Sequence, residues 1–448
     1  MTRDRENGAV DFMTVTDSTP LDLNMPGIYF KPLKSKPIQW RGRPICVVSL
    51  GCNERSVLMP AADIALQQAE IIFGSAHHFD EITHIETAAE KLIFPSPFCG
   101  LADQLAGNQQ KSIAVLASGD ALFHGIGSWL NRLVGNAHLI FYPNISSIQS
   151  CFHHLGLPWQ SAKIVSLHGR PLSSLRRYLK DQQLIAVFTD PQSNPVAIAQ
   201  ELSAQGFAES WIWVCQAMGS KQQRVTQHRA AELATLQQSF HALNVCVIHL
   251  HGNAPALPAF PGIADHFFST GAPPGFGMIS KREVRLAILS LMQPGNGEVA
   301  WDIGAGCGSV SVEWARWNDQ GQIYAIERNL ERIEHIQINS ERFGSRLNLT
   351  VIEGQAPDCC ASLPDPDCVF IGGSNGLRGM LEYAWRRLKP GGKLVASAVT
   401  ESSRLSLEEF TRGKAQREWI EIQVSKNLPN SDHERTLSPV VLAKCLKP

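Results

Sequence analysis

The sequence predicts an α/β protein built from two sheet-containing halves. From about residue 44 onward, short apolar runs typical of buried strands alternate with helix-length segments, and this alternation is typical of α/β architecture. The rhythm breaks once, over 253–274, where proline, glycine and small residues are concentrated. A chain of 448 residues also exceeds what one hydrophobic core usually organises. We therefore expect one domain over 41–255 and a second over 256–448.

Residues 1–40 differ from the rest of the chain because they lack sustained periodicity. They contain Pro20, Pro26, Pro32 and Pro37, and proline interrupts both helices and strands. We expect a flexible or draped extension here, and we assign it no function.

The elements of each half follow from the apolar runs. In the first half we expect a helix over 60–72 and strands over 44–51, 111–119, 138–143, 162–167, 184–189, 210–216 and 244–250. In the second half we expect a helix over 280–291 and strands over 297–304, 321–327, 347–353, 367–372 and 392–399. The halves share no obvious period, so the sequence predicts no internal repeat.

The composition argues against several classes of function. The formal net charge is -1 and the isoelectric point is near 6.9, so the chain has no general attraction to nucleic acid or anionic lipid. No apolar run approaches the ~20 residues that span a bilayer, and the N-terminal MTRDRENGAVDF lacks the apolar core of a signal peptide. We expect a cytoplasmic protein with no nucleic-acid or membrane partner, and reduced thiols, since the eleven cysteines include no CxxC pair.

The second half carries a glycine turn between a strand and a helix. Asp302, Gly304, Gly306 and Gly308 end an apolar run and lead into the helical segment 309–317. Glycines at such a turn let the backbone approach a nucleotide-like ligand, and the first amides of the helix can meet its polar groups. Taken alone, the turn also fits a dinucleotide site or a purely structural connection.

Further features favour a methyltransferase. Glu327 ends the next expected strand, 19 residues after Gly308, where a carboxylate can meet ribose hydroxyls. The glycine spacing is GxGxG, not the GxGxxG of dinucleotide sites, and LKPGGKL at 388–394 resembles a signature of class I S-adenosylmethionine-dependent methyltransferases. The resemblance implies that Asp302 and the three glycines hold the methionine end of the cofactor and that Glu327 holds the ribose. It also implies an adenine-side turn at Gln355 and Ala356, although an exposed loop is the alternative for Gln355.

The flanks of this turn resemble one methyltransferase family. Residues 277–285 (GMISKREVR), the WDIGAGCG turn and FIGGS at 370–374 are similar to the precorrin C15-methyltransferase (decarboxylating) domain over most of 270–420. Gly372 and Gly373 would then leave room for a bulky macrocycle, the alternative being a tight strand exit. We expect Lys281, Arg282 and Arg285 to anchor substrate carboxylates, because they lie beside the cofactor turn in sequence.

The first half carries its own loop at a strand end. The run from Ser118 to Gly127, SGDALFHGIG, follows the apolar run 113–117 and resembles the SGDPLFYG loop of tetrapyrrole methylases, which bind S-adenosylmethionine in a cleft between two subdomains. The resemblance makes Ser118, Gly119, Asp120 and Phe123 cofactor-binding residues. Ala121 departs from the family, which has proline there.

A second run, SLHGR at 166–170, is similar to the precorrin C5-methyltransferase domain. His168 and Arg170 are candidate contacts to the substrate, and so are Arg176 and Arg177. The alternatives are a hydrogen-bonded structural histidine and a solvated charged face. We expect no metal, since the histidine pairs at 77–78, 153–154 and 249/251 lack further ligands at useful spacing.

The combination of halves resembles the precorrin-6Y C5,15-methyltransferase (decarboxylating) family across about 44–445. It implies a tetrapyrrole methylase fold of two subdomains followed by a Rossmann-like class I methyltransferase domain. The implied reaction uses two S-adenosylmethionine molecules, methylates a precorrin-6 macrocycle at C5 and C15, and removes the ring C acetate as carbon dioxide to give precorrin-8, in cobalamin biosynthesis. We assign no catalytic acid or base, because sulfonium methyl transfer to an electron-rich carbon needs mainly alignment and exclusion of water.

Two alternatives remain at this stage. The chain could methylate RNA or another metabolite, with the first half presenting the substrate, although the balanced charge argues against RNA. One half could instead be a regulator that no longer binds cofactor, an idea that Ala121 and Gln355 keep open. The sequence leaves a homo-oligomer open and does not say whether the tetrapyrrole carries cobalt.

Overall fold

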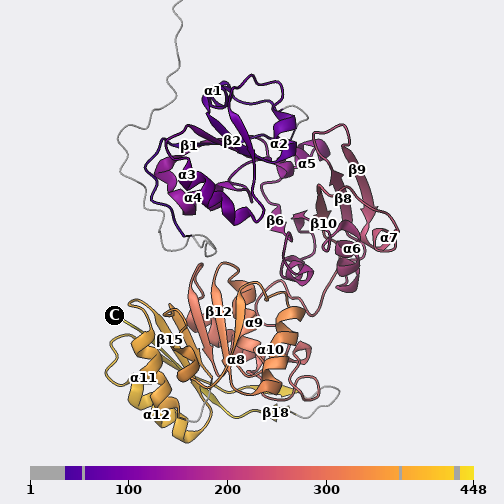
Figure 1. The fold of residues 1–448 in the computed structure, drawn as a ribbon. Helices are drawn as coiled ribbons and strands as arrows, with labels where there is room; N and C mark the ends of the chain where they lie inside the picture. The colour runs from indigo at the N-terminus through magenta and orange to yellow at the C-terminus, as the bar shows by residue number, and fades with distance from the viewer. Residues whose placement is uncertain (1–35, 53–55, 373–375, 428–433) are drawn as a thin grey trace, which may run out of the picture. The chain divides into compact units, whose positions relative to one another are not determined.

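The computed structural model describes residues 36–52, 56–372, 376–427 and 434–448. Nearly all of the expected extension over 1–40 therefore lies outside the described residues. The chain divides into two compact units, Met1–Ser147 and Ile148–Pro448, and each is described by itself (Figure 1). The domain boundary that we place at 255/256 stays a prediction.

The first unit is built on a parallel five-stranded sheet in the order β3-β2-β4-β1-β5. Its strands are β1 Ile45–Ser49, β2 Ile71–Gly74, β3 Glu90–Ile93, β4 Ile113–Ala117 and β5 Leu139–Tyr142. Its helices are α1 Pro60–Gln68, α2 Ala76–Glu81, α3 Leu101–Gly107 and α4 Gly127–Val134, with short 3-10 turns at Phe98–Gly100 and Asn136–His138. Val47 and Val48 enter different apolar clusters, so both faces of the sheet are covered, as the continuous apolar strands require.

The second unit begins with a mixed sheet in the order β6-β7-β10-β8-β9, in which only β6 and β7 are parallel. Its strands are β6 Lys163–Ser166, β7 Leu184–Phe188, β8 Trp211–Gln216, β9 Arg224–Arg229 and β10 Asn244–His249. The accompanying helices are α5 Ser147–Leu155, η3 Leu172–Tyr178, α6 Pro195–Ala204 and α7 Ala230–Leu233, and η4 Asp265–Phe267 follows the sheet.

The same unit contains a seven-stranded sheet in the order β13-β12-β11-β14-β15-β19-β16. Its strands are β11 Val299–Ile303, β12 Gln322–Glu327, β13 Leu349–Glu353, β14 Cys368–Ile371, β15 Lys393–Ala398, β16 Arg417–Ile422 and β19 Val440–Leu446; β17 Ser425–Asn427 and β18 Glu434–Thr436 form a separate ribbon. The five strands from β13 to β15 are parallel and β19 is antiparallel to β15. The order reverses between β11 and β14, which is where ligands bind in open α/β sheets.

Helices cover both faces of this sheet. They are α8 Arg282–Met292, α9 Ser309–Trp317, α10 Leu330–Arg342, α11 Leu377–Arg387 and α12 Glu401–Thr411, with a short 3-10 turn at Asp358–Cys360. One apolar cluster contains Ile288, Val312 and Ile336 of the first three helices, and the other contains Leu381 and Leu407 of the last two. Neighbouring residues of β11, such as Ala300 and Trp301, fall in the two different clusters, so the two groups of helices lie on opposite faces of the sheet.

Every strand that we expected from the apolar runs is present, which confirms the α/β class. One expected helix was too long: α1 ends at Gln68, and Ile71 and Ile72, placed in the helix 60–72, belong to β2. The backbone turns to an extended conformation at Ala69, and both isoleucines are then buried in the sheet. Within the described ranges no helix is long and apolar enough to cross a bilayer.

Two candidate cofactor sites

The glycine turn after β11 requires glycine at three places. Gly304, Gly306 and Gly308 have φ values of +76°, +60° and +78°, a region that other residues rarely adopt. A Cβ on Gly308 would lie 3.0 Å from Cγ2 of Ile336 on α10, and one on Gly306 would lie 3.4 Å from the carbonyl oxygen of Met278. The turn therefore has little room for side chains, and its backbone stays open to a ligand.

Asp302 lies in β11 directly before the turn and is buried. Its Oδ2 accepts a hydrogen bond from the hydroxyl of Ser311 on α9, but its Oδ1 has no hydrogen-bond partner among the residues that the structure describes. Burial, with a smaller contribution from the nearby charge of Glu327, raises the pKa of Asp302 to about 7. A buried carboxyl with an unused acceptor fits a ligand that brings a cationic donor, such as the ammonium group of a methionine moiety.

Glu327, at the end of β12, holds the turn in place. Its Oε2 accepts from the amide of Gly306 at 2.9 Å, and its Oε1 accepts from the amides of Arg328 and Asn329 at 3.0 Å each. A carboxylate has about four acceptor positions, so one position remains for a ligand hydroxyl. The expected ribose contact is compatible with this geometry.

The turn after β13 joins the same edge of the sheet. The amide of Gly354 donates to the carbonyl oxygen of Glu327 at 3.0 Å, which links the ends of β12 and β13. Gln355 is exposed and Ala356 is half-buried against the apolar cluster below it. This hydrogen bond connects the turn that contains Gln355 and Ala356 to Glu327, which in turn contacts the glycine turn.

Gly372 closes this edge at the end of β14. Its amide donates to the carbonyl oxygen of Ile303 at 3.0 Å, and a Cβ at this position would lie 3.0 Å from the carbonyl oxygen of Gly304. The close approach of β14 to the turn thus accounts for glycine here, which agrees with the tight-exit alternative. Gly373 lies outside the described residues.

In the first unit, the loop from Ser118 to Gly127 follows β4. Gly119 (φ +61°) forms an antiparallel bridge with Gly51 at the end of β1, with N to O distances of 3.1 and 3.2 Å. Asp120 accepts from the amide of Leu122 at 2.8 Å and Phe123 is half-buried. The loop is therefore tied to the end of a neighbouring strand, as a binding loop on a rigid sheet should be.

Ala121 has a structural role that the family's proline could not fill. Its amide donates to the buried hydroxyl of Ser49 at 3.0 Å, and proline has no such donor. The departure from the family pattern is thus compensated by a hydrogen bond to β1. Asn144 supports the same edge by donating to the carbonyl oxygens of Ser49 at 3.2 Å and Val57 at 3.1 Å.

Comparison with known proteins shows which families the two halves of the chain match. A family model for tetrapyrrole (corrin/porphyrin) methylases matches residues 44–234, and one for a precorrin methyltransferase domain matches residues 275–443. A precorrin-6Y C(5,15)-methyltransferase (decarboxylating) from Sinorhizobium sp is 35% identical over 80% of this chain and 84% of its own length.

This chain belongs to the precorrin-6Y C5,15-methyltransferase (decarboxylating) family.

Other relatives cover parts of this methyltransferase. A probable cobalt-precorrin-6B C(15)-methyltransferase (decarboxylating) from Methanothermobacter thermautotrophicus is 36% identical over 33% of this chain and 75% of its own. A cobalt-precorrin-7 C(5)-methyltransferase from Salmonella typhimurium is 28% identical over 40% of this chain and 88% of its own. The crystal structure of a precorrin-6y C5,15-methyltransferase from Geobacter metallireducens is 36% identical and covers 42% of this chain and 96% of its own, with a TM-score of 0.39.

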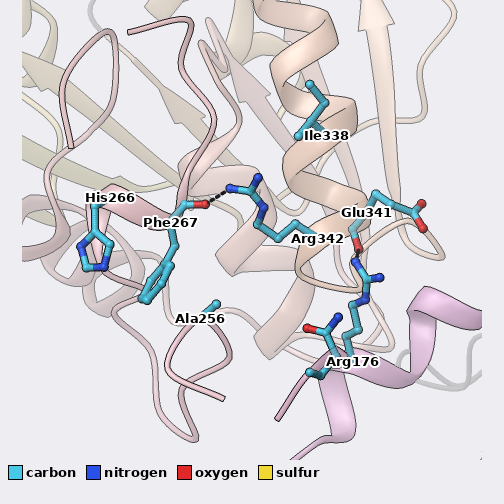
Figure 2. Close-up of a pocket in the computed structure, with 8 residues that line it drawn as sticks. Arg176, Ala256, His266, Phe267, Ile338, Glu341 and Arg342 are labelled. Atoms are coloured by element: carbon cyan, nitrogen blue, oxygen red, sulfur yellow. Dashed lines mark hydrogen bonds between the residues drawn. The ribbon is translucent and has the colours of Figure 1, made fainter. Parts of the chain in front are cut away.

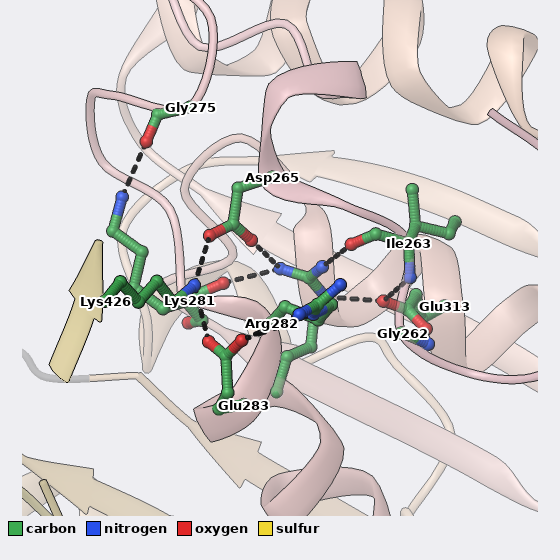
Figure 3. A network of polar contacts seen from close by, with 11 residues as sticks. Gly262, Ile263, Asp265, Gly275, Lys281, Arg282, Glu283, Glu313 and Lys426 are labelled. Carbon is green, nitrogen blue, oxygen red and sulfur yellow. Dashed lines mark hydrogen bonds and ion pairs between the residues drawn. The ribbon is translucent and has the colours of Figure 1, made fainter. Parts of the chain in front are cut away.

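Among the basic residues expected to meet substrate in the methyltransferase, Arg285 is engaged by the protein itself. Its partners Asp265, Ile263 and Glu313 belong to the polar network in Figure 3. It is fully buried, its Nε lies 2.6 Å from Glu313, and its other nitrogens contact Asp265 and the carbonyl oxygens of Ile263 and Ser280. With its donors occupied in this way, Arg285 fastens the segment before α8 to α9. We therefore assign it a structural role and no substrate contact.

The two neighbouring basic residues differ from Arg285. The Nζ of Lys281 donates to the carbonyl oxygen of Gly275 at 2.8 Å, and Lys281 is half-buried. Arg282 is exposed and forms an ion pair with the adjacent Glu283 at 3.2 Å. Arg282 is the better placed of the two to reach an outside carboxylate.

His168 and Arg170 belong to the first half of the sequence, 41–255, and to the second compact unit. His168 is exposed, and Arg170 donates to the carbonyl oxygen of Ser166 at 3.1 Å. Their loop is held by Asp190, which accepts from the amide of Gly169 at 2.9 Å. Backbone amides of Ser193, Gly169 and Gln192 donate to Asp190 and lower its pKa. Both candidates remain available to a ligand.

Arg176 and Arg177 have partners inside the second unit. Arg176 pairs with Glu201 at 2.5 Å and donates to the carbonyl oxygen of Glu341 at 3.1 Å, and Figure 2 shows it beside a cavity of about 540 Å³. Arg177 is buried and donates to Asn348 and to the carbonyl oxygen of Ala315, each at 2.8 Å. No residue of either glycine loop lines this cavity, so we do not assign it to the methyl-transfer chemistry.

One residue beside the second site carried no sequence signal. Glu313 has the pattern of one charged residue on an amphipathic helix. Only the fold brings it to Arg285.

Proposed function

We propose that this methyltransferase uses one S-adenosylmethionine site in each unit, with C5 methylation in the first half and C15 methylation with decarboxylation in the second. The observation that carries the proposal is the pair of glycine loops, each at the carboxyl ends of parallel strands in a separate sheet. Relatives named for C15 alone and for C5 alone each match a part of the chain, so the two reactions also occur as separate proteins.

The residues proposed to bind the cofactor divide between the two sites. In the first site they are Ser118, Gly119, Asp120 and Phe123. In the second site they are Asp302, Gly304, Gly306, Gly308, Glu327, Gln355 and Ala356. When bound, S-adenosylmethionine supplies a methyl group on a positively charged sulfur, which an electron-rich carbon of the macrocycle can accept.

The protein's contribution is mainly one of position. The glycine turns hold backbone amides at the ligand, and Asp302 supplies a buried acceptor near the same turn. Holding two reactants in line and excluding water accounts for much of the rate of such transfers. This explains why the chemistry needs no triad of acid and base residues.

The tetrapyrrole carries several acetate and propionate groups that need partners. We propose Arg282 and Lys281 as partners of these groups in C15 methylation, and His168 and Arg170 as further contacts to the macrocycle. Room for the macrocycle at Gly372 and Gly373 stays a proposal from the family resemblance, since Gly373 lies outside the described residues. The proposed substrate is a precorrin-6 macrocycle, and the proposed product is precorrin-8.

The test is a single incubation. The purified chain is mixed with precorrin-6B and S-adenosylmethionine, and the product is weighed by mass spectrometry. We expect the gain of two methyl groups and the loss of one carbon dioxide per macrocycle. A product with methyl groups but its full set of carboxyls would contradict the decarboxylating role of the second half.

A further inference from the structure

His78 connects helix α2 to the first glycine loop, although it belongs to neither proposed site. It is the third residue of α2, and its backbone amide donates to Oγ of Ser75 at 3.2 Å. In return, the backbone amide of Ser75 lies 3.2 Å from Nδ1 of His78. This reciprocal pair is a capping box in which histidine replaces the usual Glu or Gln.

The capping box determines which ring nitrogen carries the proton. A backbone N–H can only donate, so Nδ1 of His78 must accept with its lone pair, and a neutral ring then carries its proton on Nε2. Nε2 lies 2.8 Å from Oγ of Ser118, the first residue of the loop after β4. His78 is therefore the donor and Ser118 the acceptor, and the proton of Ser118 must be donated elsewhere.

The surroundings keep this arrangement fixed. His78 is 7% exposed and its ring meets the edge of Phe94 at 6.0 Å. Burial, with a smaller effect of His77, lowers the pKa of His78 to about 4, so the ring stays neutral near pH 7. Ser118 itself is exposed, between the buried residues Ala117 and Gly119. Ser118 is thus open to solvent as a residue, while its hydroxyl oxygen is held by His78.

We propose that His78 is a positioning residue of the first site, which fixes the Ser118 hydroxyl as a hydrogen-bond donor to a ligand carboxylate. This inference rests on the proposed cofactor role of loop 118–127. A carboxylate is the charged acceptor that both ligands share: the cofactor has one on its methionine end, and the macrocycle has several. Hydrogen bonds to ionised acceptors are the stronger ones.

The binding test uses S-adenosylhomocysteine as probe, titrated calorimetrically into the full chain carrying Gly306→Val, so that only the first site takes up ligand. We expect Ser118→Ala and His78→Phe each to weaken binding about tenfold, the loss typical of one hydrogen bond to a charged group. His78→Gln should restore most of the affinity, because its amide nitrogen can occupy the place of Nε2. The double variant should bind no worse than Ser118→Ala alone.

His77 offers a matched control on the same helix. Its side chain is 63% exposed and pairs with Glu81 at 3.0 Å, so His77→Phe should leave affinity unchanged. If the carboxylate belongs to the macrocycle, the Ser118 and His78 variants should instead leave this titration unchanged and raise the KM for tetrapyrrole in C5 methylation about tenfold. Either result supports the positioning role, and the two distinguish the source of the carboxylate.

Other results would overturn it. The proposal would be wrong if His77→Phe and His78→Phe lost equal affinity, or if the losses of affinity were additive in the double variant. It would also be wrong if Ser118→Ala changed the binding of neither ligand. Histidine ¹⁵N NMR of the unaltered chain gives a readout that does not depend on folding of variants: we expect His78 as the Nε2–H tautomer at pH 7, and an Nδ1–H tautomer would contradict the proposal. A Gly306→Val chain that binds no S-adenosylhomocysteine would contradict the proposed first site itself, and the inference with it.

Discussion

Asp302 is buried, and its Oδ1 accepts no hydrogen bond from any described residue. Such a group is costly in the free protein and useful only when a ligand completes it. The cost is visible in its pKa, which burial raises from 3.8 to about 7. The residue is thus better suited to binding than to stability.

The raised pKa of Asp302 predicts how stability depends on pH. Between about pH 4 and pH 7 the folded chain keeps a proton on this carboxyl that an unfolded aspartate has released. Its contribution to stability is therefore full below about pH 4 and is lost as the pH rises toward 7. We expect Asp302→Asn to melt several degrees higher, relative to the unaltered chain, at about pH 8 than at about pH 5. Thermal unfolding at the two pH values checks this, and an equal difference at both would contradict it.

Arg282 and Arg285 lie one turn apart on α8 but should respond differently to substitution. Arg285→Ala leaves Glu313 buried without its partner, which typically costs about 3–5 kcal/mol. Arg282→Ala removes an exposed side chain, so we expect no measurable loss of stability but about a tenfold rise in the KM for tetrapyrrole in C15 methylation. Chemical unfolding and steady-state kinetics measure the two effects. If the Arg285→Ala chain had normal stability and a raised KM for tetrapyrrole, Arg285 would be a substrate contact and the structural role would be wrong.

At the scale of elements, strands that carry unbroken apolar runs could be predicted from the sequence, because burial on both faces leaves no polar positions in β4 or β14. The strand β2 could not be predicted, since it closely follows α1 and its isoleucines continue an apparent helical face. The glycine turns could be predicted because their residues are adjacent in the sequence. The partners of Arg285 and His78 were not, because Glu313 is 28 residues from Arg285 and Ser118 is 40 residues from His78.

Element η3 packs against the end of α9 and the segment after α10 through Arg177. Arg177→Ala leaves the carbonyl oxygen of Ala315 and Asn348 without this donor, at a cost of about 1–3 kcal/mol. We expect the variant to show a second calorimetric unfolding transition, as 148–255 separates from the seven-stranded sheet. Lys163→Ala is the control, because its half-exposed pair with Asp319 at 3.3 Å contributes less than about 1 kcal/mol. Identical traces for the two variants would contradict this role.

At the scale of the whole molecule, the chain joins two reactions that relatives also carry out as separate proteins. Its membership of the C5,15-methyltransferase family favours the tetrapyrrole over RNA as substrate. The first unit contributes a parallel sheet with one loop site, and the second contributes the reversal point between β11 and β14. The account therefore depends on two independent cofactor sites in one chain.

Equilibrium dialysis against radiolabelled S-adenosylhomocysteine counts these sites directly. We expect two molecules bound per chain, one after Gly306→Val, whose Cβ would approach the carbonyl oxygen of Met278, and one after Gly119→Val, whose backbone needs a positive φ. A single molecule bound per unaltered chain, or the loss of both from either substitution, would contradict the account.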